Sequence, residues 1–134
     1  MIVVDATALV DFLLDKPAAV GLVNELSGSS LVHAPELIDL ECLNTLRRMV
    51  RHQLITEAEG DAAASDLDHA QIVRYRHRLL RHRVWELRHN LSSDDASYLA
   101  LAEALPGSIL VTGDAGLYGV AGESLGVDRV RHSP

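Results

Sequence analysis

The stretch from residue 91 to residue 117, LSSDDASYLALAEALPGSILVTGDAGL, constrains most strongly what this chain can fold into. Its small and apolar residues predict a helix over 96–104, which a Pro-Gly pair closes, and then a buried strand over 109–111. Asp95 stands at the start of the helix, and Asp114 stands where the strand must end. Such a unit can bring both carboxylates to one edge of a sheet, and acids at such an edge suggest metal chemistry.

The N-terminus repeats this arrangement of a strand followed by an acid. Residues 2–4 form an apolar run with two adjacent valines, which predicts a buried strand, and Asp5 follows it. Because ligands gather outside the carboxyl ends of strands in open α/β sheets, a functional acid is expected at Asp5. An aspartate that only caps the following helix, expected over 7–14, is the alternative. The same alternative holds for Asp95, which occupies the capping-box position after Ser92.

Strands and helices alternate along the rest of the chain. We expect helices over 17–26, 35–51, 56–68 and 78–89 and from residue 115, and strands over 31–33, 72–76 and 127–130. The second helix should end in the polar run 27–30, and the strand 72–76 should lie at a sheet edge. In the helix 78–89 we expect four residues to face inward: Leu79, Leu80, Val84 and Leu87. This order predicts an α/β fold with a mostly parallel central sheet covered on both faces.

The helix expected over 35–51, which Pro35 opens, carries a further candidate acid. Its predicted core stripe recurs every three to four positions: Leu37, Leu40, Leu43, Leu46 and Val50. Glu41 does not fall opposite this stripe, because apolar residues precede it by one turn. A partly buried carboxylate is costly unless it is paired or bound to a metal. Glu36 and Asp39 have the ordinary interpretation of first-turn charges that the helix dipole favours.

The composition bounds the remaining possibilities. A chain of 134 residues fits a single domain over 1–134. Cys42 is the only cysteine, which excludes an intramolecular disulfide and a multi-thiolate zinc site and favours a small residue packed within a helix. No apolar run approaches the roughly 20 residues that cross a bilayer, and the N-terminus enters a strand pattern without a basic leader. We therefore expect a cytoplasmic protein with no membrane association.

The charge is unevenly spread. A net charge of −7 argues against a protein that holds nucleic acid by a diffuse positive surface. Six of the twelve basic residues nevertheless lie in one short span: Arg74, Arg76, Arg78, Arg81, Arg83 and Arg88. Guanidinium groups suit bidentate phosphate contact, but solvated faces of a strand and a helix explain the cluster about equally well. His33, at an expected strand end without a spaced partner, is more typical of a hydrogen-bonding histidine than of a metal ligand.

Four acids are candidates for one site: Asp5, Glu41, Asp95 and Asp114. Brought together, they would repel one another unless a divalent cation were bound, and oxygen-only ligation suits Mg²⁺ or Mn²⁺. Such a site supports hydrolytic phosphoryl chemistry, because the cation activates water and neutralises charge on the phosphate.

Four segments carry a resemblance to a known family: VVDATALV, PELIDLECLNTLRR, WELRHNLSSDDASYLALAEAL and ILVTGDAGL. In order and context they resemble the PIN-domain ribonucleases, and among these the VapC toxins of bacterial type II toxin–antitoxin pairs. The resemblance covers essentially the whole chain. It implies a three-layer α/β/α sandwich, a Mg²⁺- or Mn²⁺-dependent endoribonuclease that cuts RNA with a metal-activated water, a homodimer, and a cognate antitoxin that blocks the acidic site.

The resemblance also assigns roles to residues. The four candidate acids match the family's acidic quartet, and Thr7 and Thr112 match hydroxyl positions that help to organise the site. The chain departs from the family in having Asp94 where many relatives have an aromatic residue, and Ala115 and Gly116 where a basic residue often follows the last acid. Phosphate contacts are therefore expected from four arginines of the basic span: Arg74, Arg78, Arg81 and Arg88.

Other functions fit the residues less well. A phosphatase with a nucleophilic Asp5 would need a second acid two residues later, where Thr7 stands. A receiver-type signalling domain would need a late lysine, but the only lysine is Lys16. The non-enzyme alternative is a catalytically weak interaction module that keeps this fold and acts by binding a partner.

Overall fold

In the computed structural model, which describes residues 1–27 and 31–134, five strands form one parallel sheet in the order β3-β2-β1-β4-β5. The strands are β1 (Ile2–Val4), β2 (Val32–Pro35), β3 (Ile72–Tyr75), β4 (Ile109–Thr112) and β5 (Val130–His132). The helices are α1 (Ala6–Leu13), α2 (Pro17–Ser27), α3 (Ile38–Arg51), α4 (Glu57–His69), α5 (Arg81–Glu86), α6 (Ser93–Ala104) and α7 (Ala115–Leu125). Two short 3₁₀ turns, η1 (His77–Leu79) and η2 (Val127–Arg129), complete the chain.

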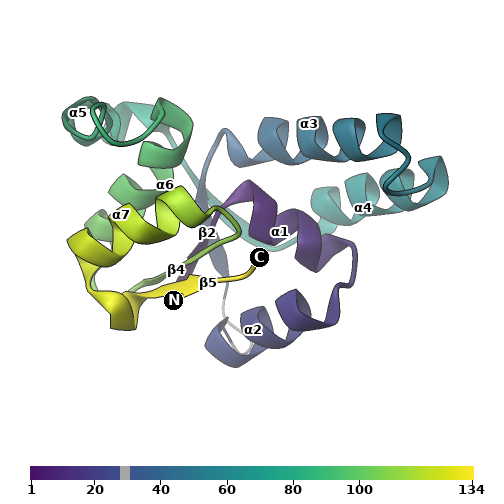
Figure 1. Ribbon diagram of the computed structural model, residues 1–134, viewed down its shortest axis with the longest axis horizontal. Helices are drawn as coiled ribbons and strands as arrows, with labels where there is room; N and C mark the ends of the chain where they lie inside the picture. The colour runs from purple at the N-terminus through teal and green to yellow at the C-terminus, as the bar shows by residue number, and fades with distance from the viewer. Residues whose placement is uncertain (28–30) are drawn as a thin grey trace.

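Helices cover both faces of the sheet. Helices α1 to α4 pack against one another on one side, whereas α5 and α7 pack against α6 on the other (Figure 1). The predicted three-layer α/β/α sandwich is confirmed, and the sheet is parallel throughout. The chain leaves β1 toward β3 and later returns to β4 on the other side of β1. The strand order therefore reverses between β1 and β4, which is where open α/β sheets bind ligands.

The core lies between the sheet and these helices. The strand residues Ile2, Val3, Leu110 and Val111 are fully buried, as expected for strands of a parallel sheet that is covered on both faces. Helix α6 is buried on nearly every side over residues 96–102, which explains why its apolar and small residues show no single stripe. Helix α6 contacts three neighbouring strands of the sheet, β1, β2 and β4.

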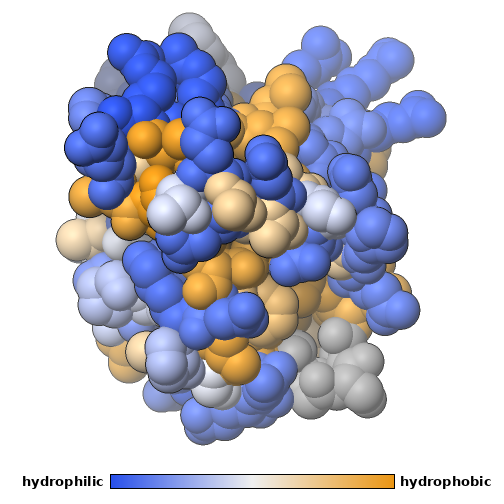
Figure 2. Space-filling model, turned by 90° about the vertical axis from the view of Figure 1, so that its right-hand side faces the viewer, coloured by the Kyte–Doolittle hydropathy of each residue, from blue (hydrophilic) through white to orange (hydrophobic). Residues whose placement is uncertain are grey.

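The predicted start of α3 is wrong, and its predicted core stripe is wrong at Leu40 and Leu43. Pro35 is the last residue of β2, because Glu36 N–H still donates to Tyr75 O at 2.9 Å, and the helix begins at Ile38. Three residues of α3 are buried: Ile38, Cys42 and Leu46. Leu40 and Leu43, in contrast, are 74% and 44% exposed. Figure 2, which views the side of the molecule that carries α3 and α4, shows hydrophobic surface among hydrophilic residues.

Two other predicted elements differ from the structure. The helix expected over 78–89 is split into η1 and α5, since Leu80 N–H donates to His77 O at 2.8 Å in a 3₁₀ turn. Leu80 and Leu87 are buried as predicted, but Leu79 is 77% exposed. The strand expected over 127–130 begins only at Val130, because η2 precedes it and Arg129 Nε donates to Ser108 O at 2.9 Å.

The remaining local predictions hold where the structure describes them. Thr56 and Glu59 form the predicted capping box of α4, and β3 is an edge strand. Cys42 is buried within a helix. The run 28–30, at which the second helix was expected to end, lies outside the described residues. None of the described helices is long and apolar enough to cross a membrane.

Candidate active site

Asp5 lies at the carboxyl end of β1, at the point where the strand order reverses. Its side chain is almost fully buried, with the residue 3% exposed. Oδ1 accepts hydrogen bonds from Thr7 Oγ1 at 2.8 Å and from Ala8 N–H at 2.9 Å, and Oδ2 accepts one from Thr112 Oγ1. Burial raises the pKa of Asp5, and these hydrogen bonds offset part of that rise. Asp5 is thus both the cap of α1 and a buried acid at the sheet edge.

Asp114 follows β4 on the neighbouring strand. Its Oδ1 accepts from Leu117 N–H at 2.8 Å, so that it caps α7. Its own N–H donates to Thr112 Oγ1 at 2.9 Å. Because the Thr112 hydroxyl donates to Asp5 and accepts from Asp114, one buried side chain fixes both strand ends relative to each other.

Gly113 belongs to the site, although sequence reasoning did not single it out. Its N–H lies 3.2 Å from Thr7 Oγ1 and 3.4 Å from Asp5 Oδ1, so it donates to both oxygens. A Cβ atom at Gly113 would stand 2.8 Å from Thr7 Oγ1 and 3.0 Å from Ser133 O. The position therefore excludes a side chain, and the only sequence signal is a glycine between two predicted site residues.

Glu41 lies half-buried on α3 and is held by a residue from the opposite layer. The Tyr98 hydroxyl, on α6, donates to Glu41 Oε1. Burial raises the pKa of Glu41, the Tyr98 hydrogen bond lowers it, and the charges of Asp94, Asp95 and Asp5 raise it further. Tyr98 was not among the predicted site residues. A tyrosine inside a buried helix was the available signal, because its hydroxyl needs a partner.

Asp95 stands in the first turn of α6, where Ser92 Oγ accepts from its N–H at 3.2 Å. Burial raises the pKa of the Asp95 carboxyl, and the charges of Asp114, Asp5 and Asp94 raise it further. Each of the four predicted acids therefore takes part in one electrostatic cluster. Within residues 1–27 and 31–134, however, no three His, Cys, Asp or Glu side chains are close enough together to hold a metal ion as they stand.

The donor set nevertheless fits a hard divalent cation. All four acids offer oxygen atoms, and the pKa values of Glu41 and Asp95 are raised in part by the charges of neighbouring acids. A bound cation would remove that repulsion and favour the ionised carboxylates.

A groove of about 470 Å³ opens beside Glu41 on the outer side of α3. Its polar wall includes Asn44, Thr45 and Arg48, and Asp94 closes it from α6. Arg48 was not among the predicted RNA contacts. It stands seven residues after Glu41, two helical turns along the same face of α3, and that spacing was the signal available in the sequence.

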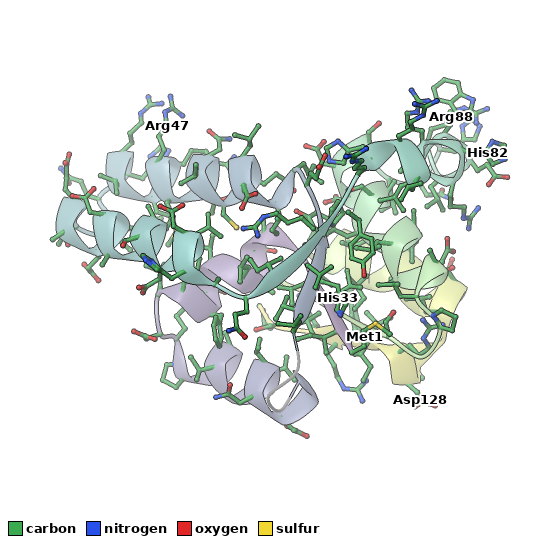
Figure 3. The ribbon with its side chains drawn as sticks, turned by 180° about the vertical axis from the view of Figure 1, so that it is seen from behind. Met1, His33, Arg47, His82, Arg88 and Asp128 are labelled. Atoms are coloured by element: carbon green, nitrogen blue, oxygen red, sulfur yellow. The ribbon has the colours of Figure 1, made fainter. Side chains whose placement is uncertain are left out.

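The arginines of the basic span have different surroundings. Arg74 is held by Asp39 through two hydrogen bonds of 2.7 Å, which occupies its guanidinium. Arg88 stacks at 4.5 Å from the ring centre of Trp85, and Figure 3 places it at the outer end of α5. In the described part of the chain no carboxylate forms an ion pair with Arg78 or Arg81.

His33 is the remaining candidate from the sequence. Its Nδ1 lies 2.8 Å from the Tyr75 hydroxyl and forms a hydrogen bond with it across β2 and β3. Burial lowers its pKa, which favours the neutral ring. Figure 3 shows His33 over the sheet, well away from the α5 end of the molecule. The hydrogen-bonding interpretation therefore describes this histidine.

Comparison with known proteins places this arrangement in a family. The PIN domain family model matches residues 2–123, and the chain therefore belongs to the PIN-domain family. VapC ribonuclease Mb0985 of Mycobacterium bovis is 40% identical over 114 residues, which cover 85% of this chain and 86% of that protein. Ribonuclease VapC1 of Mycobacterium tuberculosis is 40% identical over 131 residues, which cover 96% and 97% of the two chains. Ribonuclease VapC12 of the same species is 35% identical over 117 residues, 87% and 89% of the two chains. Within the PIN-domain family, the chain groups with the VapC proteins.

Proposed function

We propose that this chain is a toxin-type endoribonuclease of a toxin–antitoxin pair, which hydrolyses RNA phosphodiester bonds with the help of Mg²⁺ or Mn²⁺. The observation that carries the proposal is the cluster of Asp5, Glu41, Asp95 and Asp114 at the point where the strand order reverses. The cluster stands in a chain that groups with proteins named VapC ribonucleases. Mutually repelling, half-buried acids are costly unless a ligand uses them.

The proposed roles follow from the contacts of each residue. The four acids would hold the divalent cation, which supplies an activated water and neutralises charge on the phosphate. Thr7, Thr112 and Gly113 fix the orientation of the Asp5 carboxylate.

Tyr98 and Arg48 have two further roles in the site. Tyr98 of α6 holds Glu41 of α3, so the two acids contributed by helices, Glu41 and Asp95, stay in place relative to each other. Arg48 lines the groove beside Glu41 and can contact the phosphodiester.

The proposal includes two protein contacts. A cognate antitoxin would cover the acidic groove, and two copies of the chain would form a homodimer. Exposed leucines beside the groove, Leu40 and Leu43 on α3, support a protein-binding surface there, because large apolar side chains grouped at a surface mark interfaces.

Cleavage of RNA by purified protein tests the nuclease function. Wild type and an Asp66→Asn control, which changes an exposed acid on α4, should cut RNA in Mg²⁺ or Mn²⁺ and stop when the metal is chelated. Asp5→Asn should lose about a hundredfold or more of the rate, because it removes a charged oxygen ligand while keeping the side chain's shape. Thermal unfolding of each variant checks that it is folded.

Equal rates for wild type and Asp5→Asn, or no cleavage of any cellular RNA by antitoxin-free protein, would overturn the assignment. The second result would favour the catalytically weak interaction module, which keeps the fold and binds a partner.

A further inference from the structure

A second hollow opens next to the acidic groove, on the side of α5. It has a volume of about 360 Å³, within the range of small-molecule sites. Its wall is mainly apolar and includes Leu37, Leu80, Val84 and Trp85. Two charged residues, Arg81 and Asp94, also line it. The catalytic roles proposed above use none of these residues.

Trp85 is the unusual member of this wall. It is 67% exposed, and a tryptophan left this open at a surface commonly marks a binding site. Arg88 holds the ring from outside the hollow, with its guanidinium 4.5 Å from the ring centre and its Nη1 donating to Trp85 O at 2.9 Å. Arg88 thus packs against the ring, and the ring still lines the hollow.

The hollow and the acidic groove share part of their walls. Leu37 and Asp94 line both of them, and Glu41 stands in the groove. A group bound in the hollow would therefore be a close neighbour of a phosphate placed at the acid cluster. Around the hollow, Arg81 and Arg78 carry positive charges that no carboxylate of the described chain pairs with.

We propose that this hollow binds one unpaired nucleobase of the RNA substrate, stacked on Trp85, beside the nucleotide whose phosphodiester is cut. The inference rests on the proposed nuclease function and adds a subsite that selects single-stranded RNA. A base offers a flat apolar face to Trp85 and a polar edge to Arg81 and Asp94, and unstacked bases are what proteins read in single-stranded RNA. The positive charges of Arg78 and Arg81 are opposite to the negative charges of the flanking phosphates.

Polar groups at the hollow can also read the edge of the base. His77 Nε2 accepts from Leu37 N–H at 2.9 Å, so the proton of the neutral ring stands on Nδ1 as a donor. Asp94 adds an acceptor in the same hollow.

The fluorescence of the protein tests this inference without any cleavage, because Trp85 is the only tryptophan of the chain. In chelator, short oligoadenylate and oligouridylate should quench the fluorescence in a saturable manner. Inorganic polyphosphate, which has phosphates but no bases, should not. A fluorescence change that depends on protein concentration without RNA would instead place a second copy in the hollow and overturn the inference.

Matched variants measure what the ring contributes. Trp85→Ala should weaken binding of labelled oligoadenylate by about tenfold to a hundredfold, whereas Trp85→Phe should keep most of the affinity. Leu79→Ala is the control, since Leu79 is as exposed as Trp85 and does not line the hollow. RNA cleavage together with unquenched fluorescence and an unaffected Trp85→Ala variant would overturn this inference and leave the nuclease function standing.

Discussion

At the scale of single residues, uncharged hydroxyl groups hold two of the candidate site acids, Asp5 and Glu41, in position through hydrogen bonds. The Asp5 carboxylate takes hydrogen bonds from two threonine hydroxyls, and Glu41 takes one from Tyr98. Hydrogen bonds to the charged form favour it and offset the cost of burial. Asp5 caps α1, as one of its two interpretations predicted, and its role as a site acid stays a prediction.

Gly113 gives the sharpest prediction at this scale. Gly113→Ala would push a methyl group into Thr7 Oγ1 and the Ser133 carbonyl, so we expect a loss of about 1–3 kcal/mol of stability and at least tenfold lower RNA cleavage. The matched control is Gly119→Ala in α7, where nothing lies within 4 Å of the added Cβ and stability should rise by about 0.5–1 kcal/mol. Urea unfolding and initial cleavage rates check both. An unaffected Gly113→Ala enzyme would show that the close approach is not required.

At the scale of elements, α3 shows how one helix can display two apolar faces. The sequence pattern placed Leu40 and Leu43 in the core with Leu46, but α3 packs against α1 and α4 with Ile38, Cys42 and Leu46 buried. Both sets recur at helical spacing, so periodicity alone could not choose between them.

Alanine substitutions on the two faces of α3 should differ widely. Leu46→Ala removes a buried side chain and should cost about 2–5 kcal/mol. Leu40→Ala changes a side chain that is mostly in water and should stay within about 0.5 kcal/mol of wild type. Urea unfolding of the isolated protein measures both. Equal losses of stability in the two variants would show that Leu40 is part of the core.

The helices α5, α6 and α7 are joined by a carboxylate. Glu103 of α6 accepts from Arg83 Nε at 2.7 Å and Nη2 at 3.0 Å, and also from the Ser124 hydroxyl. Burial alone would raise the pKa of Glu103, but these hydrogen bonds and the charges of Arg83 and Arg129 lower it overall. A carboxylate with a lowered pKa stabilises the fold above its unfolded pKa and loses that contribution as pH falls through the folded pKa.

Glu103→Gln should therefore be pH-sensitive in its effect. The substitution should cost about 1 kcal/mol at pH 7, a modest value because Arg83 is partly exposed, and the difference from wild type should shrink as pH falls below about 4. Urea unfolding at pH 7 and below about pH 4 measures the loss of stability, and the exposed Glu25→Gln substitution is the control. A pH-independent difference would mean that shape rather than charge holds the three helices.

At the scale of the whole molecule, the fold gathers acids from four segments at one sheet edge. The net charge of −7 makes RNA binding unfavourable at long range, so a bound cation and local arginines must counter it. The single-domain organisation of residues 1–134, the homodimer and the location in the cytoplasm stay predictions.

Metal binding should be visible as stability. A cation that binds only the folded chain stabilises it by about 2.7 kcal/mol at a hundred times its Kd. Thermal unfolding of wild type and of the Asp66→Asn control should therefore shift upward with Mn²⁺ or Mg²⁺. The Asp95→Asn variant should lose most of that shift, and an equal shift in all three proteins would remove the acid cluster as the metal site.

The sequence by itself determined the alternation of strands and helices, the acids at the ends of β1 and β4, and the caps at Ser92 and Thr56. Each of these depends on residues a few positions apart, so local propensity and hydrogen bonding are sufficient. Only the tertiary structure decided that Thr112 reaches Asp5 across 107 positions and Tyr98 reaches Glu41 across 57. It also decided which face of α3 is buried and that Arg74 forms a hydrogen bond with Asp39. These outcomes depend on which segments pack together when the sheet forms. Side chains from distant segments become neighbours only through that packing, and a local sequence pattern does not contain this information.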